Sequence, residues 1–136
     1  MKRAVVDGGG FFALRVRDDR HHAQAAALFQ LADDERWALV TTNVVIIEAY
    51  SLFLARSRGG PRDAVKFLDA LRDTRCRIER IRPRDEERAI ALVRAHEDKS
   101  YSLCDALSFV VMERLGIKEA IAFDRHFSEY GRFTIP

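Results

Sequence analysis

Four acidic residues of this chain lie in apolar stretches, where a charged carboxylate is energetically unfavourable. Asp7 follows the apolar run AVV, and Asp124 follows AIAF. Glu48 lies within VVIIEAYSLF, and Asp105 lies within SLCDALSFVVM. An isolated carboxylate in such surroundings costs several kcal/mol unless it is paired or protonated. Because most other acids occupy hydrophilic stretches such as DDER and PRDEER, these four are the candidates for chemistry.

The four carboxylates would bind a cation if the fold brings them together. Two carboxylates about 4 Å apart repel by roughly 4 kcal/mol at an effective dielectric constant of about 20, so such a cluster must take up protons or a positive ion. A set of oxygen ligands without histidine or cysteine suits Mg²⁺ or Mn²⁺ better than Zn²⁺. Such an ion can polarise a phosphoryl oxygen and activate a bound water. The residue types therefore predict metal-dependent hydrolysis of a phosphoester.

Each of these acids also has a structural interpretation. Asp7 and Asp124 could cap the helices that follow them, as aspartate often does. Asp105 could stabilise the dipole of its own helix, and a salt bridge to an arginine could neutralise Glu48. For any one acid the two interpretations are comparable, but all four acids in these positions together favour a shared site.

Short apolar runs alternate with longer segments of helical period along the chain. Strands are predicted at residues 3–7, 37–41, 76–81 and 119–123, with a short last strand at 132–135. Helices are predicted at 22–34, from a cap at Thr42 or Asn43 to about Arg58, from Pro61 to about Asp73, from Pro83 onwards, and from a cap at Ser102 to Leu115. This alternation predicts an α/β fold with a parallel sheet covered on both faces, in which ligands bind beyond the carboxyl ends of the strands.

Composition bounds the class of protein. With 136 residues, of which 48% are hydrophobic and 32% charged, the chain is expected to form a single globular domain over residues 1–136. Its apolar runs are too short to cross a membrane, and its amino terminus lacks the apolar core of a signal peptide. Cys76 and Cys104 have no metal-ligand spacing, so we expect reduced thiols in a cytoplasmic protein.

Four motifs, in this order, resemble those of PIN-domain ribonucleases of the VapC toxin type. They are VVDGGGFFAL followed by DDRHH, TTNVVIIEAY, SYSLCDALSFVVMERLG and AIAFDRHFSEYG. The resemblance covers essentially the whole chain. It implies a three-layer α/β/α sandwich around a mainly parallel sheet. It also implies a divalent-metal endoribonuclease that cuts single-stranded regions of RNA and leaves 5′-phosphate and 3′-hydroxyl ends.

The resemblance assigns roles to the four acids and to partners. The acidic quartet of the family falls on Asp7, Glu48, Asp105 and Asp124. Asp7 and Asp105 would be the main ligands of Mg²⁺ or Mn²⁺, whereas Glu48 and Asp124 would ligate through water or hold a second ion. Asp98 would be a peripheral acid or part of a surface loop. The family further implies a homodimer and a small VapB-type antitoxin, which inserts a peptide into the active-site groove and competes there with RNA.

The chain departs from the family pattern directly after the first aspartate. The family usually has Thr or Ser at the position of Gly8, and a glycine there offers only its backbone N–H to a phosphate. We interpret Gly8 to Gly10 as a tight turn that opens space around Asp7. The acids predict an active ribonuclease, whereas Gly8 favours the alternative of a catalytically weak or inactive PIN-like module whose acidic cleft docks a partner. A receiver domain also gathers aspartates at strand ends, but no lysine follows a late strand as that class requires.

Several further residues are expected near the site or in the core. Ser102 is predicted mainly to cap its helix and to hold Asp105 three residues later, and it is also a candidate for contact with substrate. Arg125 is expected either to bind substrate phosphate or to form a loop salt bridge, and His126 is expected beside it at the rim. The pair His21-His22 is interpreted as a solvated helix start. Core or dimer-surface positions are expected for Phe11, Phe12, Phe53, Phe67 and Phe109.

Overall fold

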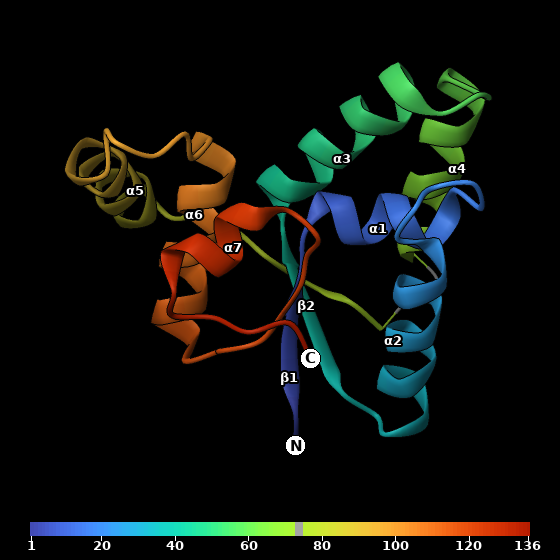
Figure 1. Ribbon diagram of the computed structural model, residues 1–136, viewed down its shortest axis with the longest axis horizontal. Helices are drawn as coiled ribbons and strands as arrows, with labels where there is room; N and C mark the ends of the chain where they lie inside the picture. The colour runs from blue at the N-terminus through green and yellow to red at the C-terminus, as the bar shows by residue number, and fades with distance from the viewer. Residues whose placement is uncertain (73–74) are drawn as a thin grey trace.

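The computed structural model describes residues 1–72 and 75–136 and contains alternating strands and helices (Figure 1). The strands are β1 (Arg3–Val6), β2 (Ala38–Thr42), β3 (Arg77–Glu79) and β4 (Ala120–Ile121). The helices of these residues are α1 (Gly8–Arg15), α2 (His22–Asp34), α3 (Asn43–Arg56), α4 (Pro61–Arg72), α5 (Pro83–Ala95), α6 (Leu103–Leu115) and α7 (Arg125–Tyr130). The predicted end of α4, near Asp73, lies outside the described residues.

The strands form one parallel sheet in the order β3-β2-β1-β4. The register pairs Val5 of β1 with Val40 of β2 and with Ala120 of β4, and it pairs Thr41 of β2 with Ile78 of β3. Figure 1 shows α1 to α4 on one side of the sheet and α5 to α7 on the other. The predicted three-layer α/β/α sandwich is therefore confirmed. Because β1 and β4 are parallel neighbours, the residues that follow them meet at one edge of the sheet.

Each helical layer packs on the sheet through aromatic side chains. On one face of the sheet, Phe67 of α4 stacks on Phe53 of α3, with ring centroids 4.9 Å apart. Phe67 also contacts Phe11 of α1, with ring centroids 5.2 Å apart. On the other face, Phe109 of α6 packs edge-on against Phe127 of α7 at 4.9 Å. All of these rings are buried, so the predicted core position of the phenylalanines among them is confirmed.

Local capping starts α3 and α6 where the sequence predicts. The Thr42 hydroxyl accepts a hydrogen bond from the Val45 N–H at 3.0 Å, and the Ser102 hydroxyl accepts one from the Asp105 N–H at 3.0 Å. Each bond satisfies one of the N–H groups that a first helical turn leaves unpaired. Helix α6 ends at Gly116, whose φ of 69° is the left-handed conformation that glycine adopts without strain.

The glycine segment after Asp7 is helical, so the predicted tight turn at Gly8 to Gly10 is wrong. Helix α1 begins at Gly8 and runs past the end of β4. A Cβ atom at Gly10 would lie 2.5 Å from the Ile121 carbonyl oxygen, a distance that real Cβ atoms do not reach. Glycine at this position lets the helix approach the strand, and this packing overrides the low helix propensity of glycine.

The predicted last strand at residues 132–135 is also wrong. These residues make only a single isolated bridge, between Glu119 and Thr134. They follow the short helix α7, which the sequence did not predict. The Ala120 N–H donates a hydrogen bond to the Thr134 carbonyl oxygen at 2.9 Å. One bridge holds the end of the chain beside β4 without the repeated pairing that defines a strand.

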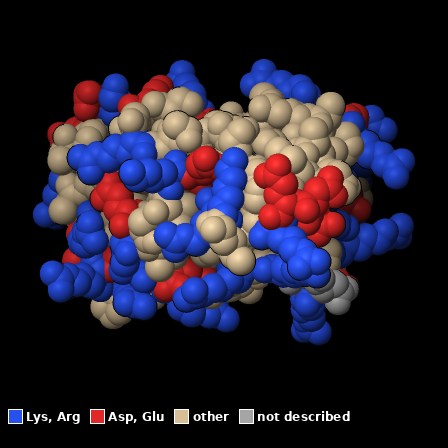
Figure 2. Space-filling model, turned by 90° about the horizontal axis from the view of Figure 1, so that it is seen from below, with Lys and Arg blue, Asp and Glu red and all other residues tan. Residues whose placement is uncertain are grey.

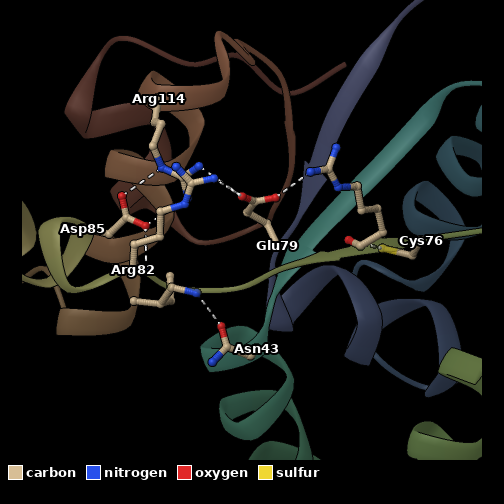
Figure 3. A network of polar contacts seen from close by, with 8 residues as sticks. Asn43, Cys76, Glu79, Arg82, Asp85 and Arg114 are labelled. Carbon is tan, nitrogen blue, oxygen red and sulfur yellow. Dashed lines mark hydrogen bonds and ion pairs between the residues drawn. The ribbon is translucent and has the colours of Figure 1, made fainter.

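A buried ion-pair network fastens α6 to β3 and α5 (Figure 3). Arg114 of α6 donates two hydrogen bonds to Asp85 of α5, both at 2.9 Å, and one to Glu79 of β3 at 3.0 Å. Asp85 is 1% exposed and Glu79 is 5% exposed. Burial alone would raise the pKa of Asp85, but the Arg114 guanidinium and the Arg82 N–H hold that pKa below its ordinary value. Because α6 also carries Asp105, this network fixes an element that supports a candidate site residue.

The described surface carries charges of both signs. Figure 2 shows the molecule from below, on the side of the amino ends of the strands, with Lys and Arg side chains intermixed with Asp and Glu. Lys2, just before β1, forms one such ion pair with Glu119 at 3.1 Å. In the part of the chain that the structure describes, no helix combines the length and the apolar character needed to cross a membrane.

Candidate active site

Asp7 is buried at the carboxyl end of β1. It is 5% exposed, and its backbone N–H donates to the Ile121 carbonyl oxygen at 3.1 Å, which ties it to the end of β4. Among the described residues, the buried Oδ1 of Asp7 has no hydrogen-bond partner. A buried carboxylate oxygen without a partner is unfavourable, and a cation that binds it would remove that penalty. Asp7 therefore has the surroundings of a metal ligand.

Electrostatic interactions couple Asp7 to the other three predicted acids. Burial, and then the negative charge of Asp105, raise the pKa of Asp7 to about 7, whereas the Gly8 N–H lowers it. The charges of Glu48 and Asp124 raise it further. The fold thus places four acids from four different parts of the sequence near enough for their charges to interact.

Asp105 lies in the first turn of α6 and is held by the cap of that helix. It is 4% exposed. Its Oδ2 accepts a hydrogen bond from the Ser102 N–H at 3.0 Å, while the Ser102 hydroxyl accepts one from the Asp105 N–H. The predicted capping role of Ser102 is confirmed, and the reciprocal pair of bonds also orients the carboxylate.

Glu48 projects from α3 and lies closer to solvent than the two buried acids. Glu48 is exposed to solvent, so the expectation that its apolar sequence neighbours surround the carboxylate is wrong. The reason is that α3 leaves part of its apolar sequence in water, with Ile47 65% exposed. Partial burial of the carboxyl group nevertheless raises the pKa of Glu48, a hydrogen bond from the Cys104 thiol lowers it, and the charge of Asp105 raises it again.

Asp124 and His126 complete the candidate site from the side of α7. Asp124 is exposed and caps this helix, because its Oδ1 accepts a hydrogen bond from the His126 N–H at 2.8 Å. The ring Nδ1 of His126 lies 2.7 Å from Asp105 Oδ2 and 3.2 Å from Asp124 Oδ1. Ligand atoms of these three residues all lie within 4.8 Å of one another, close enough to hold a metal ion.

His126 is the residue of this site that the sequence analysis missed. The sequence placed it only at the rim, beside Arg125. Its contact with Asp105 spans 21 residues, and no local pattern reveals that the ring turns back to the start of another helix. The available signal was its position two residues after an acid that follows a strand.

The other predicted rim residues differ in their placement. Gly8 is buried beside α3, and a Cβ atom there would lie 3.7 Å from Ala49, an ordinary contact. The Arg125 side chain is 77% exposed and pairs with Glu129 at 3.4 Å within α7, which matches the salt-bridge interpretation. The Asp98 side chain is 75% exposed, as the surface-loop interpretation predicts.

The set of donor atoms suits a hard divalent cation. Its carboxylate oxygens are the ligands that Mg²⁺ and Mn²⁺ prefer. A positive ion would offset the repulsion that raises the pKa of Asp7, and it would pair the free Oδ1 of that residue. The residues present therefore fit the metal that the acidic motifs predict.

Comparisons with known proteins agree with the motifs. The model of the PIN domain matches residues 4–133. Two relatives, each named 23S rRNA-specific endonuclease VapC20, come from Mycobacterium tuberculosis strains CDC 1551 / Oshkosh and ATCC 25618 / H37Rv. Each is 33% identical to this chain over 126 residues, and the match covers 93% of this chain and 92% of the relative. The crystal structure of VapC20 of the same species, a Sarcin-Ricin loop cleaving toxin, matches with a TM-score of 0.86 and 32% identity over 95% of each chain. By its sequence and by its fold, the chain belongs to the PIN domain family.

Proposed function

We propose that this protein is a divalent-metal-dependent endoribonuclease that hydrolyses phosphodiester bonds in single-stranded regions of RNA, as the toxin of a VapBC-type toxin–antitoxin pair. The proposal depends mainly on the surroundings of Asp7. This acid is buried, its Oδ1 has no hydrogen-bond partner among the described residues, and burial, followed by the negative charge of Asp105, raises its pKa. The relatives named as 23S rRNA-specific endonucleases support RNA as the substrate, and ribosomal RNA is the first target to test.

Each acid has a distinct place in the proposed mechanism. Asp7 and Asp105, the two buried acids, would be the main ligands of Mg²⁺ or Mn²⁺, while Glu48 and Asp124 would ligate through water or hold a second ion. The ion supplies charge stabilisation at a phosphoryl oxygen and makes a bound water more acidic. Glu48 faces solvent and has a raised pKa, so its carboxylate is the group best placed to accept the proton of the attacking water.

The proposal extends to partners and location. A VapB-type antitoxin would place a peptide in the acidic cleft and exclude RNA, and two copies of the chain would form a homodimer. The chain would act as one domain over residues 1–136 in the cytoplasm. Both Cys76 and Cys104 are free thiols, which suits a reducing compartment.

The purified protein is expected to cut labelled single-stranded RNA with Mg²⁺ or Mn²⁺ and to stop cutting when EDTA removes the ion. The clustered carboxylates repel substrate phosphates until a cation neutralises them. Gel analysis of 23S rRNA and of a synthetic single-stranded RNA measures cleavage. Asp105→Asn, purified in parallel, controls for contaminating nucleases. Cleavage that persists in EDTA would contradict the metal mechanism.

Gly8 favours a second function, that of a weak or inactive PIN-like module whose acidic cleft only docks a partner. The missing hydroxyl would leave one interaction with a metal-bound water or with substrate unmade. Binding of RNA or of an antitoxin peptide without any metal-dependent cleavage would support this second function over the first.

Gly8→Thr is expected to raise the rate of RNA cleavage about two- to tenfold, which is the worth of one added hydrogen bond. The contact of 3.7 Å from a Cβ atom to Ala49 shows that the position has room for a Cβ atom. Gly8→Ala is the matched control, because it adds the same Cβ atom without a hydroxyl. Single-turnover rates with saturating RNA compare the three proteins. A Thr variant no faster than the Ala variant would show that the hydroxyl contributes nothing.

A further inference from the structure

His126 joins two acids of the candidate site through one ring nitrogen. Its Nδ1 lies 2.7 Å from Asp105 Oδ2 and 3.2 Å from Asp124 Oδ1. The side chain is 15% exposed, and the Tyr101 ring packs edge-on against it with centroids 5.5 Å apart. On the far side of the ring, Nε2 lies 3.5 Å from Ser100 Oγ. The ring is thus held by several neighbours, with Nδ1 directed at the carboxylates.

The chemistry of the contact makes His126 a donor. An ionised carboxylate offers only acceptor atoms, so the nitrogen that lies 2.7 Å from Asp105 Oδ2 must carry a proton. A protonated ring nitrogen has no lone pair for a cation. In this arrangement His126 donates a hydrogen bond to the neighbouring carboxylates and is not itself a metal ligand.

Donation by His126 leaves one oxygen of Asp105 for a cation. Asp105 Oδ2 receives two donors, the Ser102 N–H at 3.0 Å and His126 Nδ1 at 2.7 Å. No hydrogen bond among the described residues uses its Oδ1. Two donors on one oxygen restrain rotation of the carboxylate, and the N–H shared with Asp124 offsets the repulsion between the two acids.

We propose that His126 is a positioning residue of the metal site, whose Nδ1–H holds Asp105 with Oδ1 free for the cation and restrains Asp124 beside it. This inference rests on the proposed function. Groups that orient metal ligands from the outer shell typically change metal affinity or activity by about 10- to 100-fold when they are removed.

The test measures Mn²⁺ affinity by isothermal titration calorimetry, together with kcat and KM for RNA cleavage, in the full chain. His126→Leu removes the donor and is expected to weaken Mn²⁺ binding about 10- to 100-fold. His126→Asn places an amide N–H near the position of Nδ1 and is expected to recover most of the affinity. His126→Gln reaches toward the position of Nε2 and is expected to bind as weakly as His126→Leu. Ser100→Ala removes only the contact of Nε2 and is expected to bind Mn²⁺ like the wild type.

The melting temperatures of the metal-free variants separate positioning from folding. The cap of α7 uses the backbone N–H of His126, which every variant retains. If His126→Leu does not fold, the comparison of His126→Asn with His126→Gln still decides the question.

Three outcomes overturn the proposal. The first is that the folded His126→Leu or His126→Gln variant binds Mn²⁺ with the affinity of the wild type. The second is that His126→Asn melts like the wild type but binds Mn²⁺ as weakly as His126→Gln. Either result leaves the proposed function intact if the wild type binds Mn²⁺ and cuts RNA. The third, a wild type that does neither, overturns the proposed function and this inference together.

Discussion

Replacing Asp7 with asparagine is expected to abolish RNA cleavage and, at the same time, to stabilise the metal-free protein at pH 8. Loss of Asp7, a proposed metal ligand, is expected to remove several kcal/mol of transition-state stabilisation and to slow the reaction about a thousandfold or more. The same change removes a charge that the fold keeps out of water, since Asp7 is 5% exposed and burial, followed by the charge of Asp105, raises its pKa to about 7. Activity and stability are therefore expected to change in opposite directions.

The stability effect has a defined dependence on pH. Aspartate in an unfolded chain has a pKa of about 3.9. The folded protein raises the pKa of Asp7 to about 7 and so binds its proton more tightly. The favourable contribution of this group is complete below about pH 4 and is lost as the pH rises through about 7. Above that pH, ionised Asp7 lowers the free energy of unfolding by on the order of 4 kcal/mol, and the neutral amide of Asp7→Asn avoids this loss.

Urea denaturation in EDTA at pH 8 and pH 5 measures the difference between Asp7→Asn and the wild type. The variant is expected to be more stable at pH 8, with a smaller advantage at pH 5. Asp98→Asn is the matched control, since the Asp98 side chain is 75% exposed, and it is expected to change neither cleavage nor stability. Mn²⁺ at 100 times its Kd is expected to stabilise the wild type and Asp98→Asn by about 2.7 kcal/mol, but not Asp7→Asn. A variant less stable than the wild type at pH 8 would show that the fold already compensates the charge of Asp7.

Arg114→Met is expected to lower the free energy of unfolding by about 3–5 kcal/mol, because it leaves the buried Asp85 without the guanidinium that binds it. Glu79 keeps its ion pairs with Arg77 at 2.9 Å and Arg82 at 3.7 Å. Glu79 and Asp85 are nearly inaccessible to water, and the guanidinium between them donates to both (Figure 3). At low pH Asp85 takes up a proton in the variant, so the loss is expected to be smaller near pH 4 than at pH 7. The lowered pKa of Asp85 predicts the same pH dependence. In the intact protein, ionised Asp85 stabilises the fold above about pH 4, and this contribution is lost as the pH falls.

Arg132→Met provides the matched control for this network. The Arg132 side chain is 67% exposed and pairs with Glu113 at 3.0 Å on the surface. Loss of an exposed pair of this kind costs about 1 kcal/mol or less. Chemical denaturation at pH 7 compares both variants with the wild type. If Arg114→Met loses no more stability than Arg132→Met, then water already screens the buried acids.

The sequence by itself determined the architecture and the placement of most of the candidate site. Apolar runs that alternate with helical segments predict a parallel sheet, and Asp7 and Asp124 follow two of those runs. Parallel strands end at one edge, so the proximity of these acids follows from the pattern. The reciprocal cap between Ser102 and Asp105 could be predicted as well, because it joins residues only three positions apart. These features depend on spacing within single elements, which the order of the residues records directly.

Only the tertiary structure decided the helical state of the glycine segment, the exposure of Glu48, the contact of His126 with Asp105 and the network of Arg114. Glycines after a strand suggest a turn, yet close packing of Gly10 on Ile121 selects a helix. His126 reaches an acid 21 residues away, and Arg114 reaches acids 29 and 35 residues away. Such contacts depend on how whole helices and strands pack against one another, and the free energy of that packing is shared among many distant residues. A local pattern therefore cannot specify which polar side chains meet, even where it specifies the elements that carry them.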